Sequence, residues 1–406
     1  MRLAVFTSQF PSKVSTFFAR DMRALLTAGI EIDIFAIYDL DPALWRYVPD
    51  ILAASVLPRE RVHHLPVLTA ARQSAEALPS ANGFARAAGA ALLSALRFGP
   101  LPAAKSLYVI PKALAWAGRF SGEFDHVLGY WGNYAATCAY LYTRAQPHPT
   151  PFSIFLHAGT DLYRDQVFLP QKLAAASHIL TCSDFNRGFL RQKYPKLYPH
   201  IEPKLHVYHH GLDFAELPFQ TKDRSATRIL AVGNFRQAKG FDYLLRAGGL
   251  LQERGVPFEI EMIGDGAEKE KLAALAHSLG LGERVIFRGW LPFEEVRAAM
   301  LQAALLVHPS AGLGDGVPNV IKEAMALGAP VVASDVAGIP EALAGGRHGL
   351  LVPPRDVEAL ANAIQRLLES PDLRRRFASG ARAFAENKYD LWRNGRELAK
   401  VLHQSS

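Results

Sequence analysis

The most constraining feature of this sequence is a regular alternation of short apolar runs with longer amphipathic segments. The apolar runs predict strands over residues 3–6, 32–36, 126–129, 152–156, 179–182 and 205–208, and then over 229–232, 258–263, 285–288, 304–307, 330–333 and 349–352. The segments between them have helical periodicity, and several end at a glycine, which often terminates helices. Strands that alternate with helices form βαβ units, so the pattern predicts an α/β protein with parallel sheets covered on both faces.

The alternation pauses once, over residues 211–228, where no strong periodicity is present. We interpret this segment as a linker between two doubly wound domains, which agrees with a chain of 406 residues at about 150 residues per domain. Ligands of such domains bind beyond the carboxyl ends of the strands. Two domains that face each other would therefore enclose a ligand cleft.

Composition excludes several classes of protein. Half of the residues are hydrophobic and 20% are charged, which predicts a sizeable core and argues against wholesale disorder. The two cysteines, Cys138 and Cys182, form no disulfide framework and indicate a reducing compartment. No apolar run approaches the ~18 residues that span a bilayer, and the N-terminal run is too short for a signal peptide, so we expect a cytoplasmic protein. The net charge of +7 favours an anionic partner, but no dense Lys/Arg tract or reader motif indicates nucleic acid.

The segment 84–120 is basic and contains no acidic residue. Its basic residues are Arg86, Arg97, Lys105, Lys112 and Arg119, and apolar and aromatic residues lie between them at helix-like spacing. One interpretation is a surface that lies on anionic lipid, to which each basic residue contributes about 1 kcal/mol. The alternative is a pair of alanine-rich helices whose basic residues face water.

The segment SAGLGDGVPNVIKEAMALGAP, residues 310–330, has the features of an anion-binding loop. It follows a predicted strand, and its helix is expected to start near Pro318 in the first turn and to end at Gly328. Glycines let backbone N–H groups approach a ligand closely, and the helix N-terminus near Gly316 adds about half a positive charge. This arrangement favours a diphosphate or a developing anion.

Two carboxylates belong to this segment, Asp315 in the loop and Glu323 in the helix. Helical side chains lean toward the helix N-terminus, so Glu323 can reach the ligand and accept hydrogen bonds from vicinal ribose hydroxyls. The alternative for Glu323 is a solvated helix residue beside Lys322.

Two further strand-to-helix segments carry candidate residues. In ILAVGNFRQAKGFDYLL, residues 229–245, Arg236 and Lys239 are placed to contact phosphate oxygens, although no Walker motif is present. In FLHAGTDLYRD, residues 155–165, His157 and Asp161 lie just beyond a strand. His157 is either a site residue or a cap.

Four segments, taken in order, resemble the C-terminal half of the family-4 retaining glycosyltransferases, or glycosyltransferase group 1. These segments are VGNFRQAKGFDYLLRA, IGDGAEKEKL, HPS…GDGVPNVIKEAMALGAPVVASDVAGIPE and HGLLVPPRDVEALANAI. Two segments of the N-terminal half are similar to bacterial exopolysaccharide members of the colanic-acid type, namely SQFPSKVSTFFARDMRALLTAG and CSDFNRGFL. The resemblance covers nearly the whole chain and is weakest over 84–120. It implies a GT-B fold with two Rossmann-like domains facing a cleft. Residues 1–213 would lie on the acceptor side and 214–388 on the nucleotide-sugar side, with a terminal helix in 389–406 crossing back to the first domain.

The resemblance also implies roles for the acids and the phosphate loop. The family's E-x7-E pair falls on Asp315 and Glu323, of which Glu323 would bind the donor ribose. Asp315 is one methylene shorter than the family's usual glutamate and would lie close to the donor sugar. Lys239 matches the family's phosphate-loop lysine, whereas Asn234 stands where an arginine is common, a charge that Arg236 could supply.

The remaining implied site residues surround the donor or the sugar. His157 resembles the cleft histidine, with Asp161 one residue later than the H-G-x-D spacing gives. We count Asp315, Glu323, Lys239 and His157 as catalytic. The implied donor-binding residues are Gly233, Asn234, Arg236, Gly316, Val317, Pro318, Asn319 and Asp161.

The implied reaction is retaining hexosyl transfer from a nucleotide-sugar to a lipid-linked or polysaccharide acceptor. Lys239, Arg236 and the helix N-terminus would stabilise the leaving diphosphate, so no metal and no other cofactor is expected. One D-x-D sequence exists, Asp39 and Asp41, but its place in a loop before the least matched region gives no reason to expect a metal there. The implied location is cytoplasmic, and peripheral at the inner face of the plasma membrane if 84–120 touches lipid.

Two other functions agree with parts of the sequence. Asp315 and Asn234 motivate a GT-B protein that binds a nucleotide-sugar but has reduced or lost transfer activity. A dinucleotide oxidoreductase would also have Rossmann-like domains, but GLGDGV at 312–317 is not the G-x-G-x-x-G fingerprint.

Overall fold

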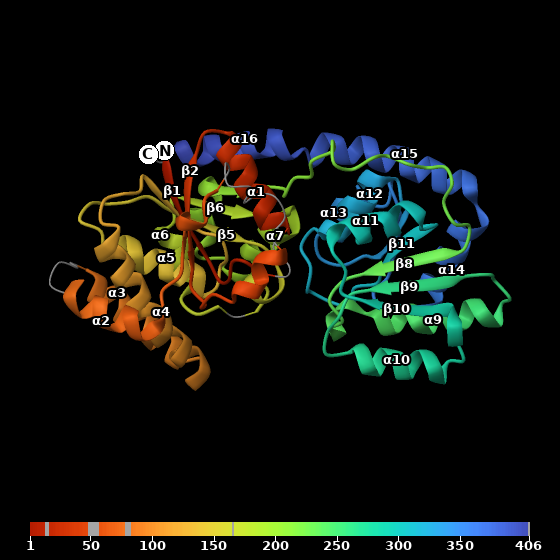
Figure 1. Ribbon diagram of the computed structural model, residues 1–406, viewed down its shortest axis with the longest axis horizontal. Coiled ribbons are helices and arrows are strands. Elements are labelled where there is room, and N and C mark those ends of the chain that lie inside the picture. Colours follow the sequence, from red (N-terminus) through yellow and green to blue (C-terminus); the bar gives the residue numbers. More distant parts are fainter. Residues whose placement is uncertain (13–15, 48–56, 78–82, 165, 405–406) are drawn as a thin grey trace. The chain divides into compact units, whose positions relative to one another are not determined.

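The computed structural model describes residues 1–12, 16–47, 57–77, 83–164 and 166–404. The chain divides into two compact units (Figure 1). Unit 1 consists of Met1–Gly211 together with Leu391–Ser406, and unit 2 consists of Leu212–Asp390. The domain boundaries expected from sequence, after residues 213 and 388, each lie two residues from these divisions.

Unit 1 is built on a parallel sheet with the order β3-β2-β1-β4-β5-β6-β7. Its strands are β1 (Arg2–Thr7), β2 (Glu31–Ala36), β3 (Val62–His63), β4 (His126–Gly129), β5 (Phe152–Leu156), β6 (His178–Thr181) and β7 (Leu205–Val207). Its helices are α1 (Thr16–Thr27), α2 (Val67–Ala77), α3 (Phe84–Leu96), α4 (Pro100–Arg119), α5 (Tyr134–Arg144), α6 (Leu169–Ala175), α7 (Asp184–Lys193), α8 (Tyr198–Ile201) and α16 (Leu391–His403). The chain builds from β1 toward one sheet edge and from β4 toward the other, so the topological switch point lies between β1 and β4.

Unit 2 repeats this plan with the order β10-β9-β8-β11-β12-β13. Its strands are β8 (Arg228–Val232), β9 (Glu259–Ile263), β10 (Val285–Gly289), β11 (Leu305–His308), β12 (Val331–Ser334) and β13 (Leu350–Val352). Its helices are α9 (Phe241–Glu253), α10 (Lys269–Ser278), α11 (Phe293–Gln302), α12 (Asn319–Leu327), α13 (Ile339–Ala342), α14 (Val357–Glu369) and α15 (Pro371–Lys388). Here the switch point lies between β8 and β11.

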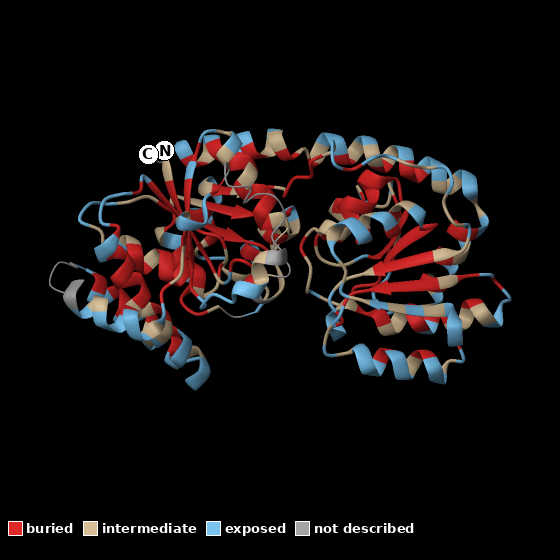
Figure 2. Ribbon diagram, in the orientation of Figure 1, coloured by how far each residue is buried: buried red, intermediate tan, exposed pale blue. Residues whose placement is uncertain are grey.

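The strands are buried because helices cover both faces of each sheet, as Figure 2 shows by the red strands within each unit. Strands buried on both faces are continuous apolar runs rather than alternating ones. The predicted parallel α/β architecture is therefore confirmed. Every predicted strand is present within about one residue of its expected bounds.

The last helix, α16, packs within unit 1 against α1. The close approach depends on Gly395, where an added Cβ would lie 2.4 Å from the Cβ of Ala24. Leu398 and Leu402 extend the contact into the core cluster of β1 and α1. The expected linker over 211–228 runs through extended and turn segments up to β8.

Candidate functional site

The loops that follow β8 and β11 meet at the switch point of unit 2. The backbone N–H of Ala311 donates to the carbonyl oxygen of Ala238 at 2.9 Å, which joins the two loops. Gly240 precedes α9 with φ +66°, and an added Cβ would lie 2.1 Å from the Pro309 carbonyl oxygen. Only glycine combines this left-handed backbone with so close an approach. The sequence thus fixes both loops against each other at the carboxyl edge of the sheet.

A charged cluster occupies this place, with Asp315 at its centre. Lys239 Nζ donates to Asp315 Oδ1 at 2.5 Å. Ser310 Oγ donates to Asp315 Oδ2 at 2.7 Å, and His308 Nε2 lies 3.0 Å from the same oxygen. The two predicted residues, Lys239 and Asp315, are therefore ion-paired across 76 residues of sequence.

Electrostatics keep this aspartate ionised. Burial by itself would raise the pKa of Asp315, but the Lys239 ammonium and the His308 hydrogen bond hold that pKa well below its usual value. Burial also lowers the pKa of His308, so its imidazole is neutral at pH 7. A neutral His308 that donates from Nε2, together with Lys239, gives Asp315 full hydrogen-bond partners.

Helix α12 runs from the end of the loop, with Pro318 as its N-cap rather than inside the first turn as expected. Gly328 ends the helix in the left-handed conformation, as expected. Glu323 is 8% exposed and Lys322 is 1% exposed. The alternative of a solvated Glu323 beside Lys322 is therefore wrong, because Glu323 is buried.

The remaining predicted donor residues surround the cluster on the same loops. Asn234 and Arg236 are exposed on the loop after β8, which begins at Gly233. Gly316 and Pro318 are buried before α12, and Val317 is half-buried.

Two side chains beside this cluster have a bearing on the site. Asn319 Oδ1 is buried and has no hydrogen-bond partner among the described residues. From the loop after β13, Arg355 Nε donates to the carbonyl oxygen of Ala311 at 2.9 Å, which adds a cation that the sequence analysis did not single out.

His157 and Asp161 lie in unit 1, beyond the end of β5. Asp161 Oδ2 accepts a hydrogen bond from the backbone N–H of His157 at 2.8 Å, so Asp161 caps the turn. The His157 ring lies 4.2 Å from the centroid of Phe155 and 4.4 Å from that of Trp131. Both ring nitrogens of His157 are buried without a hydrogen-bond partner among the described residues. His157 itself is therefore not a cap.

Beside it lies a second histidine that sequence reasoning missed. The ring of His210 stacks parallel to His157 at 5.0 Å between centroids. Asp21 on α1 is fully buried and lies 2.7 Å from His210 Nδ1, and it also accepts hydrogen bonds from Tyr130 at 2.5 Å and Tyr208 at 3.1 Å. Burial alone would raise the pKa of Asp21, but His210 and the tyrosine hydroxyls lower it.

A buried lysine holds the neighbouring loop between β4 and α5. Lys172 Nζ donates to the carbonyl oxygens of Gly132 at 2.7 Å and Asn133 at 3.1 Å, and to Thr137 Oγ1 at 3.0 Å. Burial lowers the pKa of Lys172 to about 7. The loop at the switch point of unit 1 is thereby fixed from α6.

The missed residues share one signal. His308 ends β11, and Ser310 and His210 lie two and three residues after β11 and β7, at the carboxyl edge of the sheet where ligands bind. Sequence analysis could have selected them by that position alone. Their partners, Asp315 and Asp21, could not be paired with them from sequence because contact depends on the fold.

Two further observations concern metals and membranes. Asp39 Oδ1 accepts a hydrogen bond from Lys112 Nζ at 3.2 Å, and Asp41 Oδ1 accepts one from the backbone N–H of Ala43. Within the described residues, no group of three His, Cys, Asp or Glu side chains could hold a metal ion. Among the described helices, none has both the length and the apolarity to cross a bilayer.

Comparison with known proteins relates these sites to a family. Residues 226–370 match the family Glycosyl transferases group 1. The chain is 25% identical to the amylovoran biosynthesis glycosyltransferase AmsK of Erwinia amylovora over 100% of both chains. It is 26% identical to the putative colanic acid biosynthesis glycosyltransferase WcaL of Escherichia coli K12 over 99% of both.

A similar solved structure is that of Anabaena HepE in complex with UDP-glucose, with a TM-score of 0.72 and 17% identity over 100% of both chains. That likeness extends the agreement in fold to both units. The matched segment 226–370 contains the whole Lys239–Asp315 cluster and α12. On this evidence residues 226–370 match the Glycosyl transferases group 1 family, and the whole chain shares the two-sheet α/β fold of that glycosyltransferase-like structure.

Proposed function

We propose that this protein is a retaining glycosyltransferase that moves a hexosyl group from a nucleotide-sugar to a lipid-linked or polysaccharide acceptor. The observation that carries the proposal is the cluster of Lys239, Asp315 and His308 at the switch point of unit 2, beside the N-terminus of α12. A cation and a helix N-terminus in a mostly buried place suit a diphosphate. The relatives named for amylovoran and colanic acid synthesis support an exopolysaccharide acceptor.

In this proposal Lys239 contacts the donor diphosphate and stabilises the charge that develops as the sugar departs. Asp315 positions Lys239, because it is already its partner at 2.5 Å. Glu323, on α12, binds the ribose. Asn234 and Arg236 lie on the exposed part of the loop after β8, which also carries Lys239. The acceptor hydroxyl attacks from the face that the diphosphate leaves, and its proton passes to the departing phosphate oxygen. No step in this scheme requires a metal or another cofactor.

We also propose that the reaction takes place in the cytoplasm. Both cysteines are free and buried thiols, which suits a reducing compartment.

The test of Lys239 is a transfer assay on Lys239→Ala. Loss of one preorganised charge partner typically costs ~3–4 kcal/mol, so we expect transfer to slow by about 10²–10³-fold. Lys271→Ala is the matched control, since Lys271 is an exposed lysine of unit 2 that pairs with Glu268. If Lys239→Ala kept more than about a tenth of the wild-type rate, the assignment of Lys239 to the mechanism would be wrong.

The second candidate function is nucleotide-sugar binding without efficient transfer. The observation behind it is that Asp315 neutralises the very lysine that should meet the diphosphate. A protein of this kind would bind the donor but would release no nucleoside diphosphate with any acceptor pool. If wild-type protein turns over faster than Lys239→Ala, this second function is excluded.

A further inference from the structure

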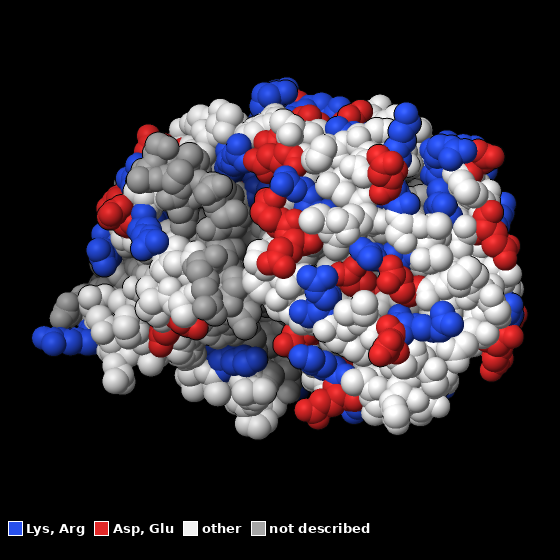
Figure 3. Space-filling view, turned by 45° about the vertical axis from the view of Figure 1, so that its right-hand side comes forward, with Lys and Arg blue, Asp and Glu red and all other residues white. Residues whose placement is uncertain are grey.

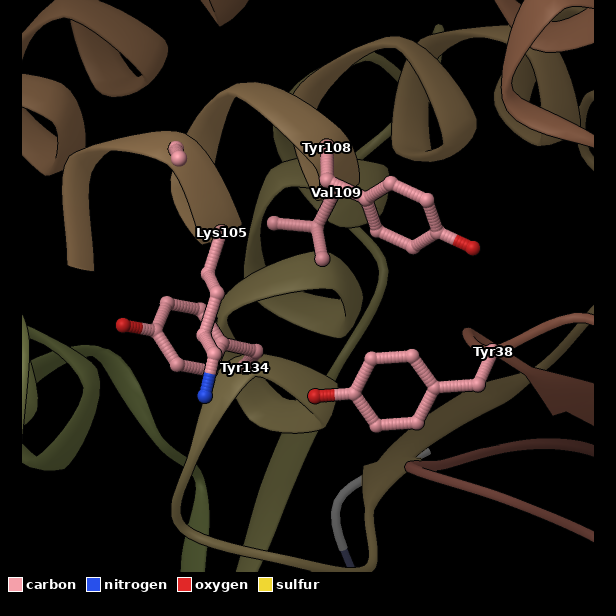
Figure 4. Close-up of a pocket in the computed structure, with 6 residues that line it drawn as sticks. Tyr38, Lys105, Tyr108, Val109 and Tyr134 are labelled. Atoms are coloured by element: carbon pink, nitrogen blue, oxygen red, sulfur yellow. The ribbon is translucent and has the colours of Figure 1, made fainter. Parts of the chain in front are cut away.

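Unit 1 contains a cavity of about 350 Å³ that the proposed transfer mechanism does not use (Figure 4). It is lined by Tyr38, Ala104, Lys105, Tyr108, Val109 and Tyr134. Tyr38 follows β2 and Tyr134 begins α5 after β4, while the other lining residues belong to α4. The cavity therefore lies at the carboxyl edge of the sheet, near the switch point where ligands of such folds bind.

Hydrogen bonds hold Tyr108, one of the aromatic walls of this cavity, in place. Lys112 is fully buried, and its Nζ donates to the Ile37 carbonyl oxygen at 2.6 Å and to the Tyr108 hydroxyl at 2.7 Å. The Tyr108 hydroxyl in turn donates to Asp39 at 3.2 Å. Lys112 therefore does not face water, so the alternative in which the basic residues of 84–120 all face water is wrong for this residue.

Polar donors converge at one side of the cavity. Figure 4 shows the Tyr38 hydroxyl pointing toward the side of the cavity where the Lys105 side chain ends beside Tyr134. The Lys105 Nζ lies 5.8 Å from the centroid of the Tyr134 ring. Burial raises the pKa of Tyr38, so its hydroxyl remains a donor at pH 7. A cation and a hydroxyl donor suit a phosphate, whereas Val109, Ala104 and the ring faces suit hydrocarbon.

Helices α3 and α4, the second of which lines the cavity, carry exposed apolar and basic side chains. Exposed large apolar side chains lie on α3, on α4 and on the turn that joins them: Leu93 (64% exposed), Leu96, Phe98, Leu101 (65%) and Leu107. The basic side chains of Arg86, Arg97, Lys105 and Arg119 are exposed on the same two helices or next to them. Over residues 84–120 no acidic residue balances them.

This surface differs from the face shown in Figure 3, where acidic and basic side chains are interspersed. A water-exposed helix pair gains nothing from five large apolar side chains, whereas a bilayer surface takes up both the apolar groups and the basic ones. A second copy of this chain would bring the same excess of positive charge to the contact, which Asp39 beside Tyr108 and Lys112 offsets by one charge. Charge complementarity therefore selects an anionic lipid surface as the occupant.

We propose that α3, α4 and the Tyr38–Lys105 cavity form a docking surface for an anionic bilayer, with the phosphate of one lipid seated between Lys105 and Tyr38. The exposed leucines enter the acyl boundary, and Arg97 contacts neighbouring headgroups. The docking surface goes beyond the proposed transfer reaction, because it needs neither donor nor turnover. A failure of vesicle binding would leave the assignment of Lys239 unchanged. A failure of the Lys239→Ala test would likewise leave the docking surface unchanged.

The test is flotation of the full chain with vesicles of phosphatidylcholine alone and of equal parts phosphatidylcholine and phosphatidylglycerol. We expect binding to the anionic vesicles only. Arg97→Gln with Lys105→Gln removes two charges and should weaken this binding about 30-fold, at about fivefold per charge. Leu96→Ser with Leu101→Ser should weaken it about tenfold per leucine.

Matched variants on unit 2 control for overall charge and apolarity. Lys269→Gln with Arg366→Gln and the single variant Ile286→Ser change exposed residues of the same types outside the surface, and they should bind as wild type. Tyr38→Phe removes only the hydroxyl from the cavity, so we expect severalfold weaker binding if a phosphate sits there.

Several results would overturn the proposal. They are absence of flotation for the wild-type chain, equal binding to both vesicle types, and unchanged binding of the Arg97/Lys105 or the leucine variants. If Tyr38→Phe bound the vesicles as tightly as wild type, no lipid phosphate would be bound in the cavity. A dimer in solution that the leucine variants dissociate, without flotation, would show a second copy as the occupant instead.

Discussion

The role of Asp315 is decided by its partners. It accepts hydrogen bonds from Lys239 and Ser310 and contacts His308, so both carboxylate oxygens are engaged within unit 2. A carboxylate held in this way is suited to orient Lys239 and is a poor nucleophile. An aspartate in place of the glutamate that the resemblance implies is thus compatible with a positioning role.

The same contacts predict a pH dependence of stability. The pKa of Asp315 lies below its unfolded value of about 3.9, so its ion pair stabilises the fold above about pH 4, and that contribution is lost as the pH falls further. We expect Asp315→Asn to lower the free energy of unfolding by about 2–4 kcal/mol at pH 7. The difference from wild type should shrink below about pH 4. Urea unfolding at pH 7 and at acidic pH measures both values.

Asp372→Asn serves as the control, because Asp372 is an exposed aspartate of unit 2 whose side chain is 92% accessible. It should change stability little at either pH. An Asp315→Asn deficit that stays the same from neutral to acidic pH would contradict the assignment of the ion pair.

Charged residues were the least predictable at this scale. Lys112, Lys172 and Lys322 are all buried, although lysine is normally exposed. Each lysine is unremarkable in the sequence, and for Lys112 and Lys172 the oxygen acceptors come from distant segments. Asp315 and Lys239, by contrast, could be selected as candidates because they lie in glycine-containing loops after strands, and Glu323 because it lies in the helix that follows.

At the scale of elements, Gly240 connects the loop after β8 to the loop after β11. We expect Gly240→Ala to destabilise unit 2 and to weaken nucleotide binding, because its Cβ would displace the Pro309 carbonyl. The matched variant is Gly255→Ala. Gly255 has nearly the same φ, +68°, but no atom within 4 Å of an added Cβ.

Gly255→Ala should therefore cost only the left-handed strain, roughly 1–2 kcal/mol. The two variants are compared by thermal melting and by nucleotide titration. Equal losses of stability, with nucleotide affinity preserved in both, would show that the Gly240 contact does not shape the site.

The elements themselves were largely predictable from sequence. Strands buried on both faces leave continuous apolar runs such as 152–156, which length and composition identify. β3 escaped prediction because it has two residues at the sheet edge, too few for any periodicity. The β3–β2 pairing also depends on the tertiary fold rather than on local sequence.

For the molecule as a whole, the two units repeat one topology, and each has a polar cluster beyond the carboxyl ends of its strands. Unit 2 gathers Lys239 and Asp315 there, and unit 1 gathers His157, His210 and Asp21. The alternation of strands and helices in the sequence predicted the two doubly wound units. It could not predict which side chains meet, because their contacts span up to 189 residues.

The central claim is that the Lys239–Asp315 cluster binds the diphosphate of a nucleotide-sugar. The most direct measurement is a thermal-shift series of wild type and Lys239→Ala with UDP, GDP, ADP, CMP and their sugar conjugates, with NAD included as a control. A ligand at ~100 times its Kd stabilises the folded state by ~2.7 kcal/mol, which is readily detected.

We predict that one nucleotide family raises the melting temperature of wild type, that NAD does not, and that the shift is largely lost in Lys239→Ala. No shift with any nucleotide, or the same shift in both proteins, would contradict the account.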